Sequence, residues 1–164
     1  MKLAADIRPL RTGLVGAWGP VGLWLCVIAV LSSDLASRST TEGGLLEVLA
    51  QVLPALAEPV GGLLESDTAM TLVRKSGHLV EYGLLAFLVV RALGLTTGIG
   101  PLRAAGLAVA FSLLVASLDE LNQSTLPSRT GTPLDVLVDG LGAVAGAWLG
   151  LRLRRGPAAF RRED

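Results

Sequence analysis

Four long apolar segments with few charges dominate the pattern of hydrophobic and polar positions along this chain. The first lies in a stretch without formal charge between Arg11 and Asp34, and its sequence LVGAWGPVGLWLCVIAVL matches the ~20 apolar residues that cross a bilayer as a helix. Three further segments contain polar residues, but each is long enough to cross if those residues find partners. The four predicted spans cover about residues 14–33, 73–95, 102–121 and 133–151.

These spans predict an all-α fold, a transmembrane four-helix bundle that forms one membrane domain over residues 1–164. The first apolar segment could instead be a secretory signal peptide. It is longer than the ~7–15 residues of a typical signal-peptide core, however, and further spans follow it. We therefore expect it to remain in the protein as a spanning helix.

The segment 34–72 between the first two spans is too long for a simple turn. Within it Leu45, Leu49, Val52 and Leu56 recur on one helical face. This pattern predicts an additional amphipathic, interfacial helix in the first extracytoplasmic loop. It would lie on the membrane surface or cap the bundle as a partial lid.

Charge and composition set the orientation and the class of protein. Most of the 14 Lys and Arg residues lie in the N-terminal segment, the short connection between the second and third spans, and the C-terminal tail. The positive-inside rule then predicts that both termini are cytoplasmic. With 51% hydrophobic and 17% charged residues and no net charge, the chain does not resemble a soluble domain or a nucleic-acid-binding protein.

Polar residues inside the second predicted span form one stripe near its outer end. At 100° per residue, Lys75, His78 and Tyr82 lie close together on the helix surface, with Glu81 at the edge of the stripe. Placing an ionisable residue inside a bilayer costs free energy. We therefore expect these residues either to pair with one another or to line a water-filled cavity.

The third predicted span has a comparable polar face. Asp119 and Gln123 share it with Ser112 and Ala116, whereas Glu120 is expected to point elsewhere, toward the headgroups.

The fourth predicted span carries Asp135 and Asp139 on one stripe that continues as Gly142, Gly146 and Gly150. Glycines at this spacing are a small-xxx-small pattern, which lets a helix approach its neighbour closely. We expect this contact to seal the floor of a polar pocket.

His78 and Asp139 are predicted to lie at one depth. Each is 13 residues from an arginine that marks the cytoplasmic boundary, Arg91 and Arg152 respectively, which corresponds to ~20 Å along a helix. A hydrocarbon core is ~30 Å thick, so both side chains would lie well inside it. We infer that the three spans enclose a polar pocket that opens outward.

Taken together, these motifs resemble the VanZ-like family of small bacterial integral membrane proteins. The resemblance covers about residues 14–151 and rests on K-x2-H-x3-Y, DE-x2-Q-x5-R and D-x3-D-x2-G, which begin at Lys75, Asp119 and Asp135. Many members have Asn where this chain has Asp139. The resemblance implies a multi-pass protein of the bacterial plasma membrane, linked to low-level resistance to the glycopeptide teicoplanin.

We predict that the pocket binds a lipid headgroup or a lipid-linked cell-envelope precursor. Lys75 and Arg129 would form a basic rim that holds a phosphate or carboxylate, although both could be ordinary interfacial cations. The candidate ligand-binding residues are Lys75, His78, Glu81, Tyr82, Asp119, Glu120, Gln123, Arg129, Asp135 and Asp139.

An alternative is a membrane-embedded acid/base hydrolase or transferase that acts on a lipid-linked phosphate, with His78, Asp119 and Glu120 as catalytic candidates. Ser76-Gly77-His78 is similar to the middle motif of membrane lipid phosphatases, but their mechanism needs a second histidine and this chain has one. No G-x-S-x-G motif is present. Whether the protein is an enzyme stays open at this point.

A purely structural interpretation is open for the same residues. His78 could hold two helices together through a hydrogen bond to a carboxylate, and the negative charge of Asp135 could stabilise the N-terminal end of its helix through the helix dipole. The spacing of His78 and the carboxylates matches no standard metal motif, so neither a metal nor another cofactor is predicted. A purely structural subunit, proton-coupled transport and homo-oligomerisation also stay open.

Overall fold

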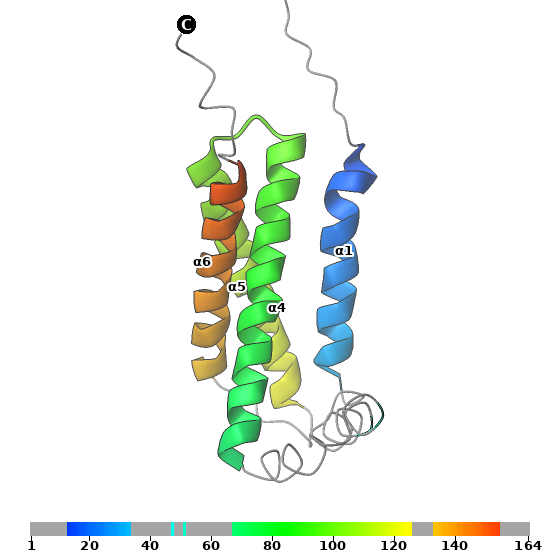
Figure 1. The fold of residues 1–164 in the computed structure, drawn as a ribbon, viewed down its shortest axis with the longest axis vertical. Helices are drawn as coiled ribbons and strands as arrows, with labels where there is room; N and C mark the ends of the chain where they lie inside the picture. The colour runs from blue at the N-terminus through cyan, green and yellow to red at the C-terminus, as the bar shows by residue number, and fades with distance from the viewer. Residues whose placement is uncertain (1–12, 34–46, 48–50, 52–66, 126–132, 155–164) are drawn as a thin grey trace, which may run out of the picture.

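The computed structural model of the chain describes residues 13–33, 47, 51, 67–125 and 133–154, and four helices account for nearly all of them (Figure 1). These helices are α1 (Leu14–Leu31), α4 (Asp67–Thr96), α5 (Pro101–Ser124) and α6 (Pro133–Arg154). No strand occurs in these described ranges. Each helix is long and apolar enough to cross a membrane. The predicted all-α class, with four helices long and apolar enough to span a membrane, is therefore confirmed.

The predicted interfacial helix falls in a segment of which the structure describes only Glu47, Gln51 and the start of α4, so it lies outside the described residues. Helix α4 begins at Asp67, six residues before the predicted start of the second span at Val73. The apolar run marks only the part of a helix that suits a bilayer. Backbone hydrogen bonding continues over the preceding polar turn, because it does not depend on side-chain hydropathy.

The helices alternate in direction, so that α1 and α5 end where α4 and α6 begin, at the bottom of Figure 1. We call this the lower end of the bundle. Helices α4, α5 and α6 pack against one another, and α1 packs on α4. The prolines Pro101 and Pro133 occupy the first positions of α5 and α6, where the missing N–H costs no helical hydrogen bond.

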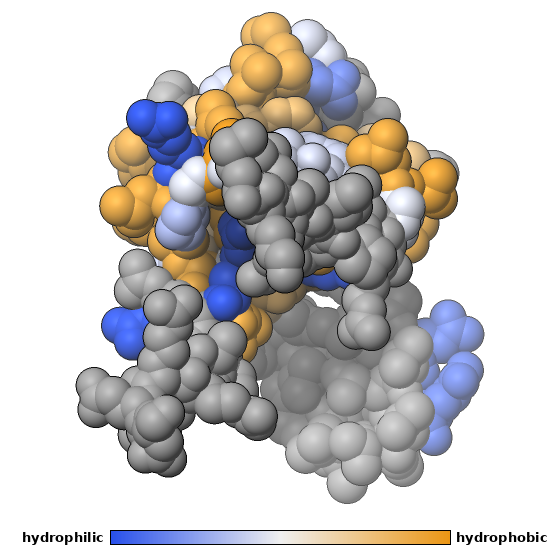
Figure 2. Space-filling model, turned by 90° about the horizontal axis from the view of Figure 1, so that it is seen from above, coloured by the Kyte–Doolittle hydropathy of each residue, from blue (hydrophilic) through white to orange (hydrophobic). Residues whose placement is uncertain are grey.

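Large apolar side chains point outward from all four helices. Many are more than half exposed, for example Leu14, Leu72, Leu107 and Leu141. In the view from above in Figure 2, apolar residues lie on several sides of the described part of the bundle. An apolar surface of this extent is unfavourable in water and suits a hydrocarbon environment. The exterior therefore agrees with a multi-pass membrane protein.

Glycines bring α6 unusually close to α4. A Cβ atom added at Gly142 would meet the backbone carbonyl of Leu79, and one added at Gly146 would meet the backbone carbonyl of Gly83. In lipid, helices associate through close packing rather than through the hydrophobic effect, so small residues at the contact are stabilising. The predicted small-xxx-small contact is thus formed between α6 and α4.

Two tryptophans attach α1 to α4 through hydrogen bonds. Trp24 Nε1 donates to the backbone carbonyl of Glu81 at 2.8 Å, and Trp18 Nε1 donates to Thr96 Oγ1 at 3.2 Å. The first of these bonds lies next to Tyr82 in the chain. It therefore fixes α1 at the level of the polar residues of α4.

We expect Trp24→Phe to lower the free energy of unfolding by about 0.5–1.5 kcal/mol, because the substitution keeps most of the ring and removes one hydrogen bond. Titration of the purified protein with a denaturing detergent measures this loss. Trp148→Phe is the control, since Trp148 lies exposed on α6 and donates no described hydrogen bond. Equal losses in the two variants would mean that the Trp24 bond does not hold α1.

Candidate functional site

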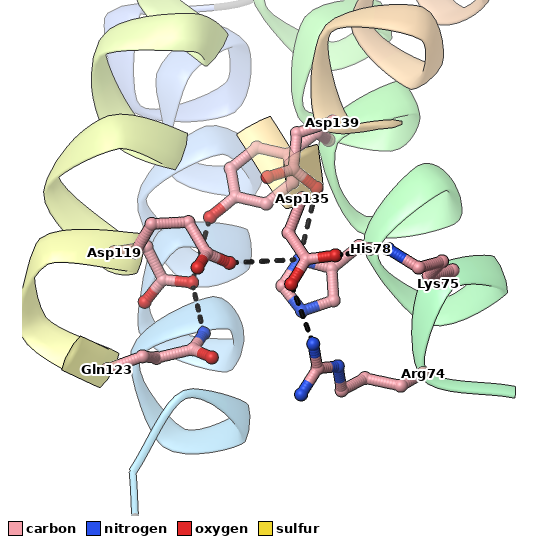
Figure 3. Close-up of polar contacts among 9 residues, drawn as sticks. Arg74, Lys75, His78, Asp119, Gln123, Asp135 and Asp139 are labelled. Carbon is pink, nitrogen blue, oxygen red and sulfur yellow. Dashed lines mark hydrogen bonds and ion pairs between the residues drawn. The ribbon is translucent and has the colours of Figure 1, made fainter. Parts of the chain in front are cut away.

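Polar side chains from α4, α5 and α6 converge inside the lower end of the bundle (Figure 3). Their positions follow from chain direction, because the first turns of α4 and α6 lie beside the last turns of α5. We call them the polar cluster, which consists of Arg74, Lys75, His78, Tyr82, Asp119, Glu120, Gln123, Asp135 and Asp139.

The centre of the polar cluster is a contact between His78 of α4 and Asp139 of α6. His78 Nδ1 lies 3.0 Å from Asp139 Oδ1, and both residues are buried. The equal depth predicted for these two residues is thus matched by direct contact. A carboxylate in this position holds the imidazole ring in one orientation.

Glu120 of α5 approaches the same imidazole, and its expected direction was wrong. Its Oε1 lies 3.9 Å from His78 Nδ1, and the residue is 6% exposed rather than directed toward headgroups. Glu120 follows the buried residues Ser112 and Ala116 at intervals of four, so it continues their face of α5. That spacing in the sequence was the signal for its burial.

A second group of hydrogen bonds extends the cluster along α5. The Tyr82 hydroxyl donates to Asp119 Oδ2 at 3.1 Å, and Gln123 Nε2 donates to the same oxygen at 2.9 Å. The rings of Tyr82 and His78 lie nearly parallel, with their centroids 6.3 Å apart. Tyr82 therefore connects the histidine of α4 with the carboxylate of Asp119.

Asp135, in the first turn of α6, binds two cations of α4 at once. Arg74 Nη2 lies 2.6 Å from Asp135 Oδ2, and Lys75 Nζ lies 2.5 Å from Asp135 Oδ1. Asp135 is 2% exposed, whereas the side chains of Arg74 and Lys75 are 38% and 28% exposed. Figure 3 shows the two cations on the α4 side of this carboxylate. The group has two positive charges and one negative charge.

Arg74 was missed by the sequence analysis, which assigned the basic rim to Lys75 and Arg129. Arg74 precedes His78 by four residues and Tyr82 by eight, so it belongs to the same stripe of α4, and this spacing was the available signal. Arg129 lies outside the described residues. Glu81 is half-buried at the edge of the stripe, and its backbone carbonyl accepts the Trp24 hydrogen bond.

The polar cluster combines two chemical elements that serve anionic ligands. Partly exposed Arg and Lys side chains can bind the oxygens of a phosphate, and a carboxylate-oriented histidine can accept or donate a proton. Both elements lie at one end of the bundle between α4 and α6, with Glu120 of α5 beside the histidine.

Comparison with models of known families identifies the family of this chain. A model of the VanZ/LLP1 family matches residues 18–154, from α1 to the end of α6. Comparisons with curated proteins and with solved structures gave no match. The matched region includes every residue of the polar cluster. The chain belongs to the VanZ/LLP1 family.

Proposed function

We propose that the polar cluster forms an outward-facing pocket that binds the phosphate group of a membrane lipid or of a lipid-linked cell-envelope precursor. The observation that supports this proposal most strongly is the convergence of Arg74 and Lys75 on one carboxylate. Both cations are partly exposed, so an anionic group that reaches the lower end can contact them. The predicted positive-inside orientation places this end in the outer leaflet of a bacterial plasma membrane.

The Asp135 carboxylate holds the two cations in place and also competes with the ligand for them. Without Asp135, two like charges on adjacent residues would repel each other, and the flexible side chains would spread apart. With Asp135, they are oriented together before the ligand arrives. This preorganisation reduces the entropy cost of binding a phosphate.

Titration of short-chain phosphate lipids into the purified protein in neutral detergent tests the proposal. Dioctanoyl phosphatidic acid represents glycerolipids and farnesyl phosphate represents isoprenoid-linked precursors, so the two ligands distinguish the sources of the phosphate. We expect Arg74→Gln and Lys75→Gln each to weaken binding about tenfold, since each removes one charge-assisted hydrogen bond.

A control variant and a control lipid test whether the binding is specific. Arg103→Gln should leave the affinity unchanged, because Arg103 lies exposed near the start of α5, far along the bundle from the polar cluster. Dioctanoyl phosphatidylcholine should bind much more weakly than phosphatidic acid, because its phosphate is shielded by a quaternary amine. Equal affinity in Lys75→Gln, Arg74→Gln and Arg103→Gln would contradict the proposal.

The contact between His78 and Asp139 favours a second candidate, acid/base hydrolysis or transfer of a lipid-linked phosphate. An imidazole oriented by a carboxylate is the usual arrangement of a general base. Release of inorganic phosphate from farnesyl phosphate tests this candidate, and His78→Gln should abolish it while the detergent-solubilised fold is retained. If the protein binds farnesyl phosphate but releases no inorganic phosphate, the enzymatic candidate is wrong and only the binding function remains.

The family resemblance implies that the protein lowers the susceptibility of cells to teicoplanin. Cells that express the wild-type protein should tolerate a higher teicoplanin concentration than cells that express Lys75→Gln at the same level. Growth assays with both strains and an empty-vector strain measure this difference.

A further inference from the structure

Three buried residues from three different helices form a group with the composition of a metal site. His78 of α4, Glu120 of α5 and Asp139 of α6 each offer one ligand atom, and these atoms all lie within 4.8 Å of one another. All three residues are less than 10% exposed. We propose that His78, Glu120 and Asp139 bind a divalent transition-metal ion, with zinc as the best-fitting ion.

The distances suit such an ion with little rearrangement. Zinc binds imidazole nitrogen and carboxylate oxygen at ~2.0–2.2 Å, so two of its tetrahedral ligand atoms lie about 3.3 Å apart. His78 Nδ1 is 3.0 Å from Asp139 Oδ1 and 3.9 Å from Glu120 Oε1, values on either side of this separation. A bound ion would replace the proton between Nδ1 and Oδ1. A small inward movement of Glu120 would complete three ligands.

An independent observation points to a missing partner at this place. Asp139 is only 1% exposed, and its Oδ2 atom is buried and has no hydrogen-bond partner in the described part of the chain. A buried carboxylate oxygen without a partner loses its hydration and gains nothing in return. The nearby cations Arg74 and Lys75 bind Asp135 rather than Asp139. A metal ion bound by both oxygens of the Asp139 carboxylate supplies the missing interaction at Oδ2.

The surroundings also suit a metal centre with an open coordination position. Three protein ligands leave a fourth position for water or for a ligand oxygen, as in catalytic zinc sites. Tyr82 packs beside the His78 ring and bonds Asp119, which restrains the ring from a second side. Because the ligands come from three helices, the ion would also stabilise the packing of α4, α5 and α6 against one another.

The sequence spacing did not predict this site, because metal motifs are recognised by ligands close together in the chain. Here the three residues are separated by 42 and 19 positions and meet only through helix packing. The inference goes beyond phosphate binding, which relies on Arg74 and Lys75. Phosphate lipids can therefore be titrated into chelator-treated protein, so that the two proposals fail separately.

The full chain, purified through an affinity tag without His or Cys, provides a sharp test. After dialysis against zinc and removal of the excess, we expect about one zinc ion per chain by elemental mass spectrometry. The protein has a single histidine, so imidazole nitrogen coupling in the pulsed EPR spectrum of the Cu²⁺-loaded protein identifies His78 as a ligand. Absence of bound zinc, or bound Cu²⁺ without nitrogen coupling, would overturn the proposal.

Variants add a second readout. Asp139→Asn and Glu120→Gln should each weaken zinc binding at least tenfold in competition with a chromophoric chelator, while circular dichroism shows that the helices remain. Glu47→Gln is the matched control, because Glu47 is an exposed carboxylate. Wild-type affinity in Asp139→Asn would show that the group binds no metal and serves only to lock the helices. If the variants do not fold, the Cu²⁺ spectrum of the wild-type protein still decides.

Discussion

Gly146→Leu is expected to disrupt the bundle, because the backbone of α4 occupies the space that the new side chain would need. Even a single Cβ at Gly146 would overlap the Gly83 carbonyl group and lie 2.8 Å from Gly83 Cα. A backbone cannot rotate away as a side chain can, so α6 would have to move outward. Overpacking typically costs 1–3 kcal/mol, and we expect at least about 3 kcal/mol for leucine at this contact.

The same substitution should also impair the polar cluster. Asp135 and Asp139 lie on α6, and their partners Arg74, Lys75 and His78 lie on α4. An outward movement of α6 separates these pairs. We therefore expect Gly146→Leu to weaken the binding of phosphate lipids as well as to lower stability. Titration of phosphate lipids into the fraction of the variant that remains folded measures this loss of affinity.

Gly106→Ala is the control for this experiment. Nothing lies within 4 Å of a Cβ added at Gly106, which is in the second turn of α5. Alanine should therefore be tolerated there, with a gain of up to about 1 kcal/mol from helix propensity. Unfolding by denaturing detergent compares both variants with the wild type. A free energy of unfolding in Gly146→Leu that equals that of Gly106→Ala would contradict the close approach of α4 and α6.

The double substitution Arg74→Gln and Lys75→Gln is expected to cost about 3 kcal/mol, because it removes both described cations from the buried carboxylate of Asp135. Removing the partners of a buried charge typically costs 3–5 kcal/mol. The lower value applies here, since both cations are partly exposed. The free energy of unfolding in neutral detergent measures the loss.

A charge-balanced variant separates stability from binding. Adding Asp135→Asn to the double substitution removes the buried negative charge that has lost these two cations, so most of the lost stability should return. Binding of phosphate lipids should not return, because the cations are still missing. A triple variant as unstable as the double variant would mean that the two ion pairs are not what compensates Asp135.

Helical periodicity placed most of the polar cluster correctly before any tertiary contact was known. Periodicity puts His78 and Tyr82 on one stripe of α4, and Asp119 and Gln123 on one face of α5. Tyr82 donates a hydrogen bond across to Asp119, and His78 contacts Asp139 of α6. This worked because a residue inside an apolar span must face a partner if it is polar. Depth followed from the fixed rise of a helix, which made the meeting of His78 and Asp139 predictable.

The direction of Glu120 and the part played by Arg74 were not predicted. Both residues lie near a helix end, where a long side chain can reach either the headgroups or the interior. The four-residue spacing puts both residues on the buried stripes of their helices, but periodicity alone does not say which partner a long side chain reaches. The partner depends on the neighbouring helix, and here Glu120 lies beside His78 while Asp135 binds Arg74.

Hydropathy and helical periodicity are local properties of the chain. The order of residues alone therefore predicts the all-α class, the four long apolar helices and the stripes on which the polar residues lie. The order of residues does not predict which carboxylate each cation binds. Nor does it predict that His78, Glu120 and Asp139 form one compact group. These contacts depend on the rotation and separation of α4, α5 and α6. Those quantities are set by the packing of side chains across helices, including the close approach at Gly142 and Gly146.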